Sequence, residues 1–508
     1  MKYLQCLMYL LLVLGVPRLI LAAEYFQIQV IDSESKRGIP LVELKTVNQI
    51  LHVTDSNGIA AINEPGLMHQ EVYFHVRSHG YEFPADGFGY QGKKIQVSPG
   101  GKAILKMKRV NLAERLYRLT GEGIYRDSLM TDADIPIAQP VLNGKVLGSD
   151  SVVNVKFKNR VYWFWGDTNF PGYPLGNFSV PGAVSDLPGQ GGLPIQQGVN
   201  LNYFLDQNGF AKKTCDMPGP GPTWIDGLVV VRDDQGNERM FAKYVKIKGL
   251  LTDYERGLVE FNAQQKVFEK RKVFDFDASL YPVGHPVKYE MSGHDYILFG
   301  LAVPLIRVPA NPDALADLKQ YETYSYLMPG SEAENWKVDR DESGALRYQW
   351  RKNVPPLTSE LEKKLIQQKK LSKQEQYFQL RDIETKERIE IQNSSVAWNE
   401  FRGKWTMIGL QKFGTSVLGE IWYSEAASPL GPWKWGRKIV THDKYSFYNP
   451  KQHPLFAREK GRLIYFEGTY YTALFSGNEV KTPRYDYNQI MYQLDLSDPR
   501  LAAELFEK

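Results

Sequence analysis

A strand–turn–strand pattern recurs five times along the chain, and this repetition constrains the fold more than any other sequence feature. The first copy spans residues 148–169 and has an apolar segment, the turn Lys158-Asn159 and an aromatic segment that ends at Trp165. Apolar and aromatic residues on both sides of a short polar turn predict a β-hairpin. At least one further strand-like segment follows each copy, so each copy predicts one antiparallel sheet of a β-propeller. The five predicted hairpins begin at Asp150, Asp226, His285, Ser394 and His453.

The predicted fold is therefore all-β: a five-bladed β-propeller that follows a small β-sandwich and carries a short helical insertion. Short strands separated by turns rich in Gly and Asn, such as residues 55–58, predict the sandwich. Leu112, Leu116 and Leu119 have helical spacing in the segment that follows it. The predicted boundaries are 1–23 for a signal peptide, 24–108 for the sandwich, 109–140 for a linker and lead-in, 141–508 for the propeller, and 358–380 for the helical insertion.

The helical insertion is rich in Lys, Glu and Gln. Two capping boxes, Ser359-x-x-Glu362 and Ser372-x-x-Glu375, predict helix starts within it. We expect a solvated helical surface there, with a partner-binding role as the alternative.

The N-terminus has the pattern of a secretory signal: Lys2, an apolar run over residues 7–16, and the small pair Ala22-Ala23. The run is short for a membrane span, although Arg18 leaves an uncleaved anchor as the alternative. Without the leader, Cys215 is the only cysteine, which excludes an intramolecular disulfide. We expect a secreted, periplasmic or cell-surface protein with no membrane span after signal removal.

Composition and motifs exclude several classes of function. A net charge of +4 over 508 residues is too small to indicate a nucleic-acid partner. The HExxH, GxSxG, Walker and dinucleotide-binding motifs are absent. We therefore expect no cofactor and no dedicated metal site, with a divalent cation at the channel mouth as an open alternative.

The polar residues that begin the five predicted hairpins would converge at one mouth of the propeller channel. Asp150 and Asp167 stand at the two ends of the first hairpin, which brings both carboxylates to the same sheet edge. In a partly desolvated mouth one carboxyl pKa rises while its neighbour stays ionised, which is the division of roles that glycoside hydrolysis uses. The alternative is that these positions are polar only because strands begin at turns.

Each candidate site residue has an expected role. Asp150 is the candidate base or nucleophile, Asp167 the candidate general acid or other member of the pair, and Asp226 would tune or orient them. Glu467 and Glu420 are reserve acids, although a solvent-facing strand position is the preferred interpretation of Glu420. The candidate substrate-binding residues are His285, His453, Ser394, Trp224 and Tyr448.

The histidines and the aromatic residues each have two interpretations. His285 and His453 would orient substrate hydroxyls or, with Asp150 and Asp226, hold a divalent cation; hydrogen-bonded inner-channel residues are the simpler interpretation. Trp224 would stack on a sugar ring, as would Tyr448, but most strand aromatics belong to a core.

The phrases Gly148-Ser-Asp-Ser151, Phe164-Trp-Gly-Asp-Thr168 and Gly419-Glu-Ile-Trp-Tyr-Ser424 resemble the glycosidase propellers of the arabinanase and levansucrase clan, in particular endo-D-arabinanase-like proteins. The N-terminal strands and turns resemble the carboxypeptidase regulatory-like (transthyretin-like) fold, which implies an accessory module. Members of the clan usually carry an acidic triad over the first three blades, whereas the third blade here has His285. This departure favours the pair Asp150 and Asp167.

The resulting hypothesis is a secreted hydrolase that cleaves glycosidic bonds of a polysaccharide or oligosaccharide with a carboxylate pair at the propeller mouth. In this hypothesis the sandwich is a spacer or a weak binding module. The competing hypothesis is a non-catalytic propeller that binds glycan or protein at the cell surface.

Overall fold

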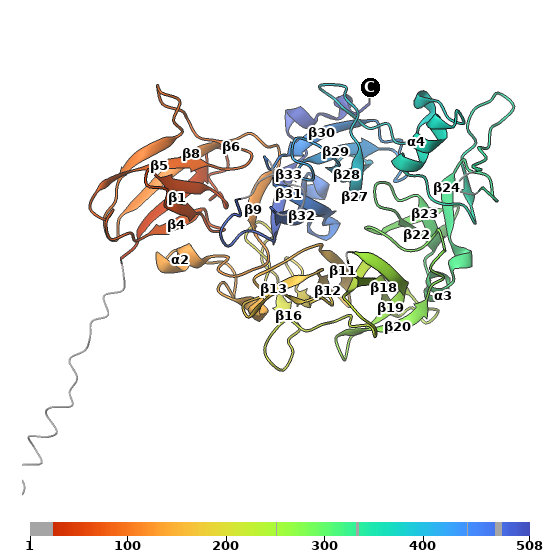
Figure 1. Ribbon diagram of the computed structural model, residues 1–508, viewed down its shortest axis with the longest axis horizontal. Helices are drawn as coiled ribbons and strands as arrows, with labels where there is room; N and C mark the ends of the chain where they lie inside the picture. The colour runs from red at the N-terminus through yellow and green to blue at the C-terminus, as the bar shows by residue number, and fades with distance from the viewer. Residues whose placement is uncertain (1–23, 250, 332–334, 444, 473–479, 508) are drawn as a thin grey trace, which may run out of the picture.

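The computed structural model describes residues 24–249, 251–331, 335–443, 445–472 and 480–507. The chain is all-β, as predicted, and consists of a sandwich at its N-terminal end beside a ring of sheets (Figure 1). The predicted signal peptide, residues 1–23, lies outside the described residues. Within the described ranges, no helix has the length and apolar character needed to cross a membrane.

Two four-stranded sheets enclose one apolar core in the N-terminal sandwich. Burial alternates along β5 (Glu71–Arg77), which places Val72, Phe74 and Val76 in this core. One sheet has the order β4 (Ile59–Ile62), β1 (Phe26–Asp32), β8 (Lys102–Arg109), β6 (Tyr81–Glu82), and the other has the order β3 (Leu51–Val53), β2 (Glu43–Thr46), β5, β7 (Gly92–Gln96).

Five sheets of four or five strands follow one another in chain order around a ring (Figure 1). The first contains β11 (Val153–Phe157), β12 (Arg160–Phe164), β15 (Gly182–Ser185) and β16 (Asn202–Tyr203), and the second β17 (Thr223–Arg232), β18 (Glu238–Lys248), β19 (Thr252–Asn262) and β20 (Val267–Val273). The third contains β21 (Val287–Met291), β22 (His294–Phe299), β23 (Ile306–Pro309), β24 (Glu322–Ser325) and β25 (Gln349–Arg351). The fourth contains β26 (Arg381–Asp382), β27 (Ile391–Asn399), β28 (Lys404–Gln411), β29 (Ile421–Ala426) and β30 (Trp435–Val440), and the fifth β31 (Ser446–Gln452), β32 (Leu463–Tyr471), β33 (Asn488–Asp495) and β9 (Glu114–Arg118).

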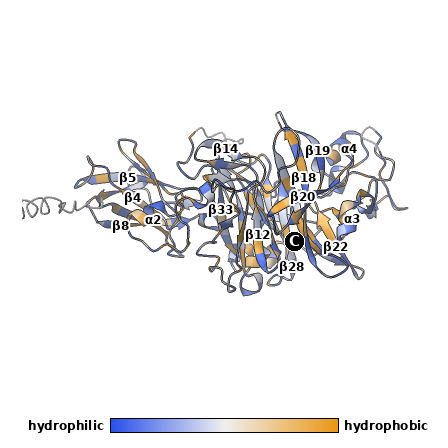
Figure 2. Cartoon of the chain, turned by 90° about the horizontal axis from the view of Figure 1, so that it is seen from below, coloured by the Kyte–Doolittle hydropathy of each residue, from blue (hydrophilic) through white to orange (hydrophobic). Residues whose placement is uncertain are grey.

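Apolar clusters fill the space between neighbouring sheets. Phe164 of the first sheet and Val230 and Tyr244 of the second belong to one such cluster. Figure 2 shows hydrophobic stretches on β12 and β18, with the sandwich at one end of the molecule. Burial between adjacent sheets therefore stabilises the ring.

The first hairpin forms as the sequence predicts. β11 pairs with β12, and the two residues that connect them, Lys158 and Asn159, have φ values of 48° and 62°. Two consecutive positive φ values are the signature of a type I′ turn, whose twist matches that of the flanking strands. Beside this hairpin lies a small sheet of β10 (Gly148–Ser149), β13 (Thr168–Phe170) and β14 (Tyr173–Asn177).

Strand β9 closes the ring, although its residues have the helical spacing expected of a linker. It pairs antiparallel with β33, with Arg118 opposite Ile490, so the last sheet takes its outer strand from the start of the ring. All five residues of β9 are buried. A strand buried on both faces lacks the alternation of polar and apolar residues by which a strand is normally recognised in a sequence.

The fifth predicted hairpin has the wrong boundaries. Its first strand is β31, which ends at Gln452, rather than a strand that begins at His453. His453 is followed by the 3₁₀ turn η4 (Pro454–Phe456). Pro454 has no N–H for a strand ladder and suits the first position of a helical turn.

The helical insertion is shorter than predicted. It contains α4 (Ser359–Gln367), capped by Thr358 rather than Ser359, and η3 (Lys373–Glu375), where Glu375 accepts a hydrogen bond from the Ser372 N–H. Leu361 and Leu365 are buried in a core cluster, so α4 packs on the ring with one face. The other helical segments are α2 (Arg126–Met130), α3 (Pro312–Ala316), η1 (Asn143–Lys145), η2 (Leu318–Gln320), η5 (Glu459–Gly461), η6 (Pro499–Leu501) and η7 (Ala503–Leu505).

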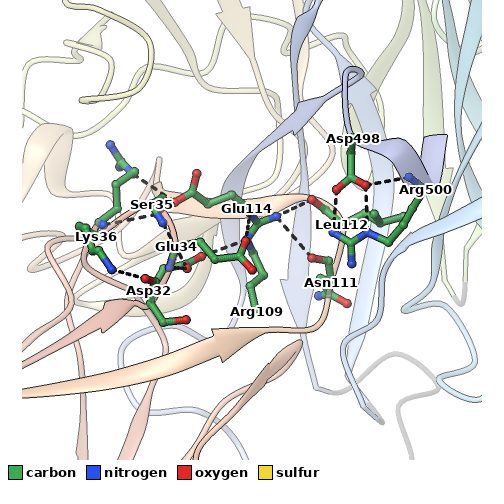
Figure 3. A network of polar contacts seen from close by, with 12 residues as sticks. Asp32, Glu34, Ser35, Lys36, Arg109, Asn111, Leu112, Glu114, Asp498 and Arg500 are labelled. Carbon is green, nitrogen blue, oxygen red and sulfur yellow. Dashed lines mark hydrogen bonds and ion pairs between the residues drawn. The ribbon is translucent and has the colours of Figure 1, made fainter. Parts of the chain in front are cut away.

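Polar contacts attach the sandwich to the ring where the two meet in sequence. Arg109, at the end of β8, donates to Asp32 Oδ2 at 3.0 Å and to the Leu112 carbonyl at 2.6 Å (Figure 3). Glu114 of β9 accepts a hydrogen bond from Ser35 in the sandwich. These bonds attach residues 109–114 to the sandwich, and β9 continues from them into the ring.

Candidate active site

A cavity of about 520 Å³ lies at the ring centre, where the first strands of the sheets begin. The five sheets all contribute to its walls, which are largely aromatic and aliphatic. Seven of the ten candidate residues line it: Asp150, Asp167, Asp226, His285, Ser394, Trp224 and Tyr448. His453, Glu467 and Glu420 lie elsewhere.

Asp150 and Asp167, here called the aspartate pair, face each other across a β-bulge. The Asp150 N–H donates to the Asp167 carbonyl at 3.3 Å, and the Gly166 N–H donates to the Asp150 carbonyl at 2.8 Å. Two residues therefore oppose one, which is the arrangement that redirects side chains near functional sites. A Cβ atom on Gly166 would lie 2.1 Å from Asp150 Oδ1, so only glycine leaves room for this carboxylate.

Aromatic side chains hydrogen-bond to the aspartate pair. Trp224 Nε1 donates to Asp167 Oδ1 at 2.8 Å, and the Tyr448 hydroxyl donates to Asp150 Oδ2 at 3.0 Å. The single hydroxyl proton of Tyr487 is shared between the Asp167 carbonyl, 3.1 Å away, and the Asp150 side chain. No described Lys, Arg or His forms an ion pair with either carboxylate.

The environment raises the pKa of both carboxyls of the aspartate pair. Desolvation, followed by the charge of Asp167, raises the pKa of Asp150 to about 7, against the opposing hydrogen bonds from Tyr448 and Tyr487. Desolvation raises the pKa of Asp167 to about 6, against the opposing hydrogen bond from Trp224. The two groups titrate as a coupled pair, so the state with one proton is favoured close to neutral pH.

Asp226 lines the same cavity but is held by backbone donors. Its two oxygens accept hydrogen bonds from the N–H groups of Gly227 and Gly284, each at 2.8 Å. Lys243 Nζ lies 3.7 Å from Oδ2. Asp226 therefore links the second sheet to the start of the third, and it is less free to react than the aspartate pair.

A row of amide and hydroxyl groups crosses the cavity wall. Asn393 Nδ2 donates to Asn449 Oδ1, and Asn449 Nδ2 donates to Ser151 Oγ, each at 2.6 Å. Asn393 Oδ1 is buried and has no hydrogen-bond partner among the residues that the structure describes. The Ser394 hydroxyl donates to the Ala302 carbonyl at 2.8 Å, which leaves it as an acceptor. Such groups can recognise hydroxyl groups of a ligand.

His285 lines the cavity as a neutral imidazole. Desolvation, followed by the charge of Lys451, holds its pKa well below the usual range. A hydrogen bond with the Pro450 carbonyl opposes this shift.

Lys451, His453 and Glu467, here called the channel group, lie away from the cavity. His453 and Glu467 are 2% and 0% exposed, with His453 Nε2 3.0 Å from Glu467 Oε1. His453 Nδ1 lies 3.0 Å from Asn154 Nδ2. Desolvation lowers the pKa of Lys451 to about 8, against the opposing charges of Glu467 and Asp226. His453 was expected at the mouth, but it directly follows the last residue of the fifth inner strand, β31, and does not line the cavity. Glu467, the reserve acid, lies in β32 and does not line the cavity either.

Glu420 is not the solvent-facing residue that we expected. It is 1% exposed, accepts a hydrogen bond from the Thr415 N–H, and lies 3.0 Å from Lys438 Nζ. It contributes nothing to the cavity lining. In the described ranges, no three His, Cys, Asp or Glu side chains are placed to hold a metal ion.

Sequence reasoning missed several residues of this site. Tyr471 is the last residue of β32, and Tyr487 directly precedes β33; neither position begins an inner strand, which is where we looked for most of the site. Asn449 was missed because the first strand of that sheet was assigned too late in the chain, and Lys451 of the channel group was missed for the same reason. The correct strand would have drawn attention to Tyr-Asn-Pro-Lys, residues 448–451.

No family model matches this chain, and no curated protein matches it. Among solved structures, a proposed hydrolase from Bacteroides ovatus is similar at a TM-score of 0.43 and 14% identity, covering 69% of this chain and 86% of that chain. An exo-β-1,3-galactanase from Phanerochaete chrysosporium has a TM-score of 0.36 and 10% identity, covering 69% and 61%. The RS223 β-xylosidase has a TM-score of 0.35 and 11% identity, covering 70% and 93%.

Proposed function

We propose that this chain hydrolyses glycosidic bonds of an oligosaccharide or polysaccharide with the aspartate pair as its reacting groups. One observation carries the proposal: two neighbouring carboxyls with pKa values raised to about 7 and about 6 lie on the wall of a cavity of about 520 Å³. Glycoside hydrolysis needs one protonated and one ionised carboxyl beside the same bond.

The surroundings of each carboxyl set the proposed roles within the pair. Desolvation and the charge of Asp167 both raise the pKa of Asp150, so we assign Asp150 the proton and the role of general acid on the glycosidic oxygen. Asp167 stays ionised and attacks the anomeric carbon. This reverses the assignment made from the sequence, because the field of the Asp167 charge could not be read from sequence position.

The close approach of the pair favours retention of configuration. The Asp150 N–H lies 3.3 Å from the Asp167 carbonyl oxygen, and the charge of Asp167 acts on the Asp150 carboxyl. Retaining glycosidases hold their carboxyls about 5–5.5 Å apart, whereas inverting enzymes leave room for a water molecule at roughly 6.5–9.5 Å.

The remaining cavity residues suit sugar recognition. Trp224, Tyr448, Tyr471 and Tyr487 supply aromatic surface. The amides of Asn393 and Asn449 supply hydrogen-bonding groups for hydroxyls. Neutral His285 adds a polar group without a charge.

A reducing-end assay against furanose-rich and acidic polysaccharides tests the proposal. We expect Asp150→Asn and Asp167→Asn each to lower kcat by roughly 10²–10⁴-fold, because each removes a proton-transfer or attacking group. Asp234→Asn, in an exposed turn, is the matched control and should leave kcat unchanged. NMR of the first product should show the retained anomer.

Three outcomes would count against the proposal. Hydrolysis that survives both substitutions excludes the aspartate pair. An inverted product points to a partner carboxyl across the cavity, for which Asp226 is the candidate. Binding without turnover on every glycan would favour the non-catalytic propeller.

We also propose that the chain is exported, because residues 1–23 have the pattern of a secretory signal. N-terminal sequencing of protein expressed with this segment tests the idea. A mature chain that begins at Glu24 supports export.

A further inference from the structure

Residues 482–488 connect the sandwich to the aspartate pair. Within this segment the Tyr485 hydroxyl donates to the carbonyl of Thr54 in the sandwich. Two residues later, the Tyr487 hydroxyl donates to the Asp167 carbonyl and hydrogen-bonds with the Asp150 side chain. Two tyrosines of one short segment therefore contact different parts of the molecule, one in the sandwich and one in the site.

The sandwich contact is made by a turn, residues 54–58, here called the docking turn. Thr54, Asp55 and Ser56 are 0%, 1% and 3% exposed, although connecting turns normally lie on the surface. Asp55 Oδ2 accepts hydrogen bonds from the N–H and the hydroxyl of Ser128, both at 2.7 Å, and Ser56 Oγ accepts one from the Arg118 N–H at 3.1 Å. The docking turn is thus bonded to α2 and to β9 of the ring.

Arg118 holds Tyr485 from the other side. Its guanidinium lies 4.6 Å from the centre of the Tyr485 ring and donates to the carbonyl of Arg484. Tyr485 is 1% exposed. The side chain is therefore enclosed between the docking turn and the closing strand of the ring.

The backbone of this segment needs such support. Arg484 and Tyr487 have φ values of 64° and 62°, in the left-handed region that bulky residues disfavour. Such conformations persist when surrounding contacts hold them. Tyr485, anchored to Thr54, lies between the two.

A second contact reaches the start of the same segment. His79 of the sandwich lies with Nε2 2.9 Å from the Tyr470 hydroxyl, which in turn lies 3.0 Å from Thr482 Oγ1. Residues 482–488 are thus tied to the sandwich at both Thr482 and Tyr485.

We propose that the sandwich is a positioning element of the active site, in which the docking turn holds Tyr485 and thereby sets the Tyr487 hydroxyl against the aspartate pair. The catalytic meaning of this role rests on the proposed function. Tyr485 is a positioning residue, since it touches neither carboxyl. A spacer or an independent binding module would need no such link.

The direction of the expected effect follows from the Tyr487 hydrogen bond. This donor stabilises the ionised form of Asp150, so its displacement raises the pKa of the aspartate pair. The other titratable groups that face the pair from neighbouring elements are Tyr448, Tyr471, Asp226 and His285.

The test follows the Trp224 indole N–H by NMR over about pH 4–9, because this group donates to Asp167. The chain has 10 tryptophans, so Trp224→Phe assigns the signal. We expect Tyr485→Phe, which removes only the hydroxyl, to raise the titration midpoint by about half a pH unit, and Tyr487→Phe by at least as much. The double variant should move it no further than Tyr487→Phe alone, because both act through one contact.

Tyr321→Phe is the matched control. It also removes a buried tyrosine hydroxyl, which donates to the Leu315 carbonyl at 2.9 Å. Tyr321 lies beside the third sheet of the ring, next to β24. We expect it to lower the melting temperature as Tyr485→Phe does and to leave the midpoint unchanged. If Tyr485→Phe lowers the melting temperature and also leaves the midpoint unchanged, the proposal is wrong.

The NMR titration needs no substrate, so it separates the two proposals. A shifted midpoint in a protein that hydrolyses no glycan would reject the proposed function and retain the positioning role. Hydrolysis by the wild type with an unshifted midpoint in Tyr485→Phe would retain the function and reject the positioning role.

Discussion

Two polar clusters near the inner strands of the ring contain buried carboxyls, and different groups surround the carboxyls in each cluster. In the aspartate pair, two like groups adjoin a cavity and are hydrogen-bonded by tyrosine and tryptophan. In the channel group, Glu467 is fully buried and faces an imidazole and a lysine ammonium. Burial raises the carboxyl pKa in both clusters.

A raised pKa is therefore not enough to identify a reacting carboxyl. Glu467 has a pKa well above its usual range, yet no substrate atom can reach it through the described structure. Access to a cavity, together with a neighbouring group whose pKa differs, distinguishes the aspartate pair. Three predictions test this contrast.

The largest effect is expected when the bulge that presents Asp150 is blocked. Gly166→Ala places a methyl group where Asp150 Oδ1 now lies, 2.1 Å from the ideal Cβ position. A misplacement of about 1 Å can cost roughly 10²-fold in rate, so we expect kcat to fall by about that factor. Gly66→Ala, with no atom within 4 Å of its Cβ position, is the control for kinetic assays of the folded variants. Unchanged kcat in Gly166→Ala would mean that the position of Asp150 is unimportant.

A substitution in the channel group should change the activity much less. Glu467→Gln keeps the shape of the side chain and matches the protonated form that burial favours. We expect kcat/KM to stay within about threefold of the wild type, which is less than about 1 kcal/mol of barrier. A loss as large as that of Asp150→Asn would place Glu467 in the catalytic machinery.

The smallest expected effect is the change in melting temperature that Asp150→Asn causes, and this change depends on pH. The folded-state pKa of Asp150, about 7, is above its ordinary value of 3.8, so the folded protein binds this proton more tightly than the unfolded chain. Stability is therefore lost as pH rises from about 4 to about 7, and the loss is complete above that range. Asp150→Asn removes the ionisable group, and we expect its melting temperature to exceed that of the wild type by roughly 2–4 °C at about pH 8.

At about pH 4 both forms of residue 150 are neutral, so the difference in melting temperature should vanish. Asp234→Asn is exposed and serves as the control at both pH values. A gain of the same size at both pH values would show that the effect is unrelated to ionisation of Asp150.

Local sequence patterns were sufficient for much of the fold. The first four predicted hairpins form, and the first has its turn at Lys158-Asn159 as predicted. The start of the fifth was misplaced because Pro454 begins an apolar run, residues 454–457, that forms a 3₁₀ turn and not a strand, and β9 was missed because both its faces are buried. Alternation is informative only where one face of a strand meets water.

Some features of the candidate site likewise followed from local sequence, and others required the structure. The sequence by itself determined that Asp150, Asp226, His285 and Ser394 lie near the starts of inner strands, since turn residues and strand patterns act over a few residues. Only the tertiary structure decided that Glu467 is enclosed, that the pKa of both Asp150 and Asp167 is raised, and that Thr54 bonds to Tyr485, 431 residues away. Desolvation and Coulomb interactions depend on distances between segments remote in sequence, and no local pattern encodes those distances.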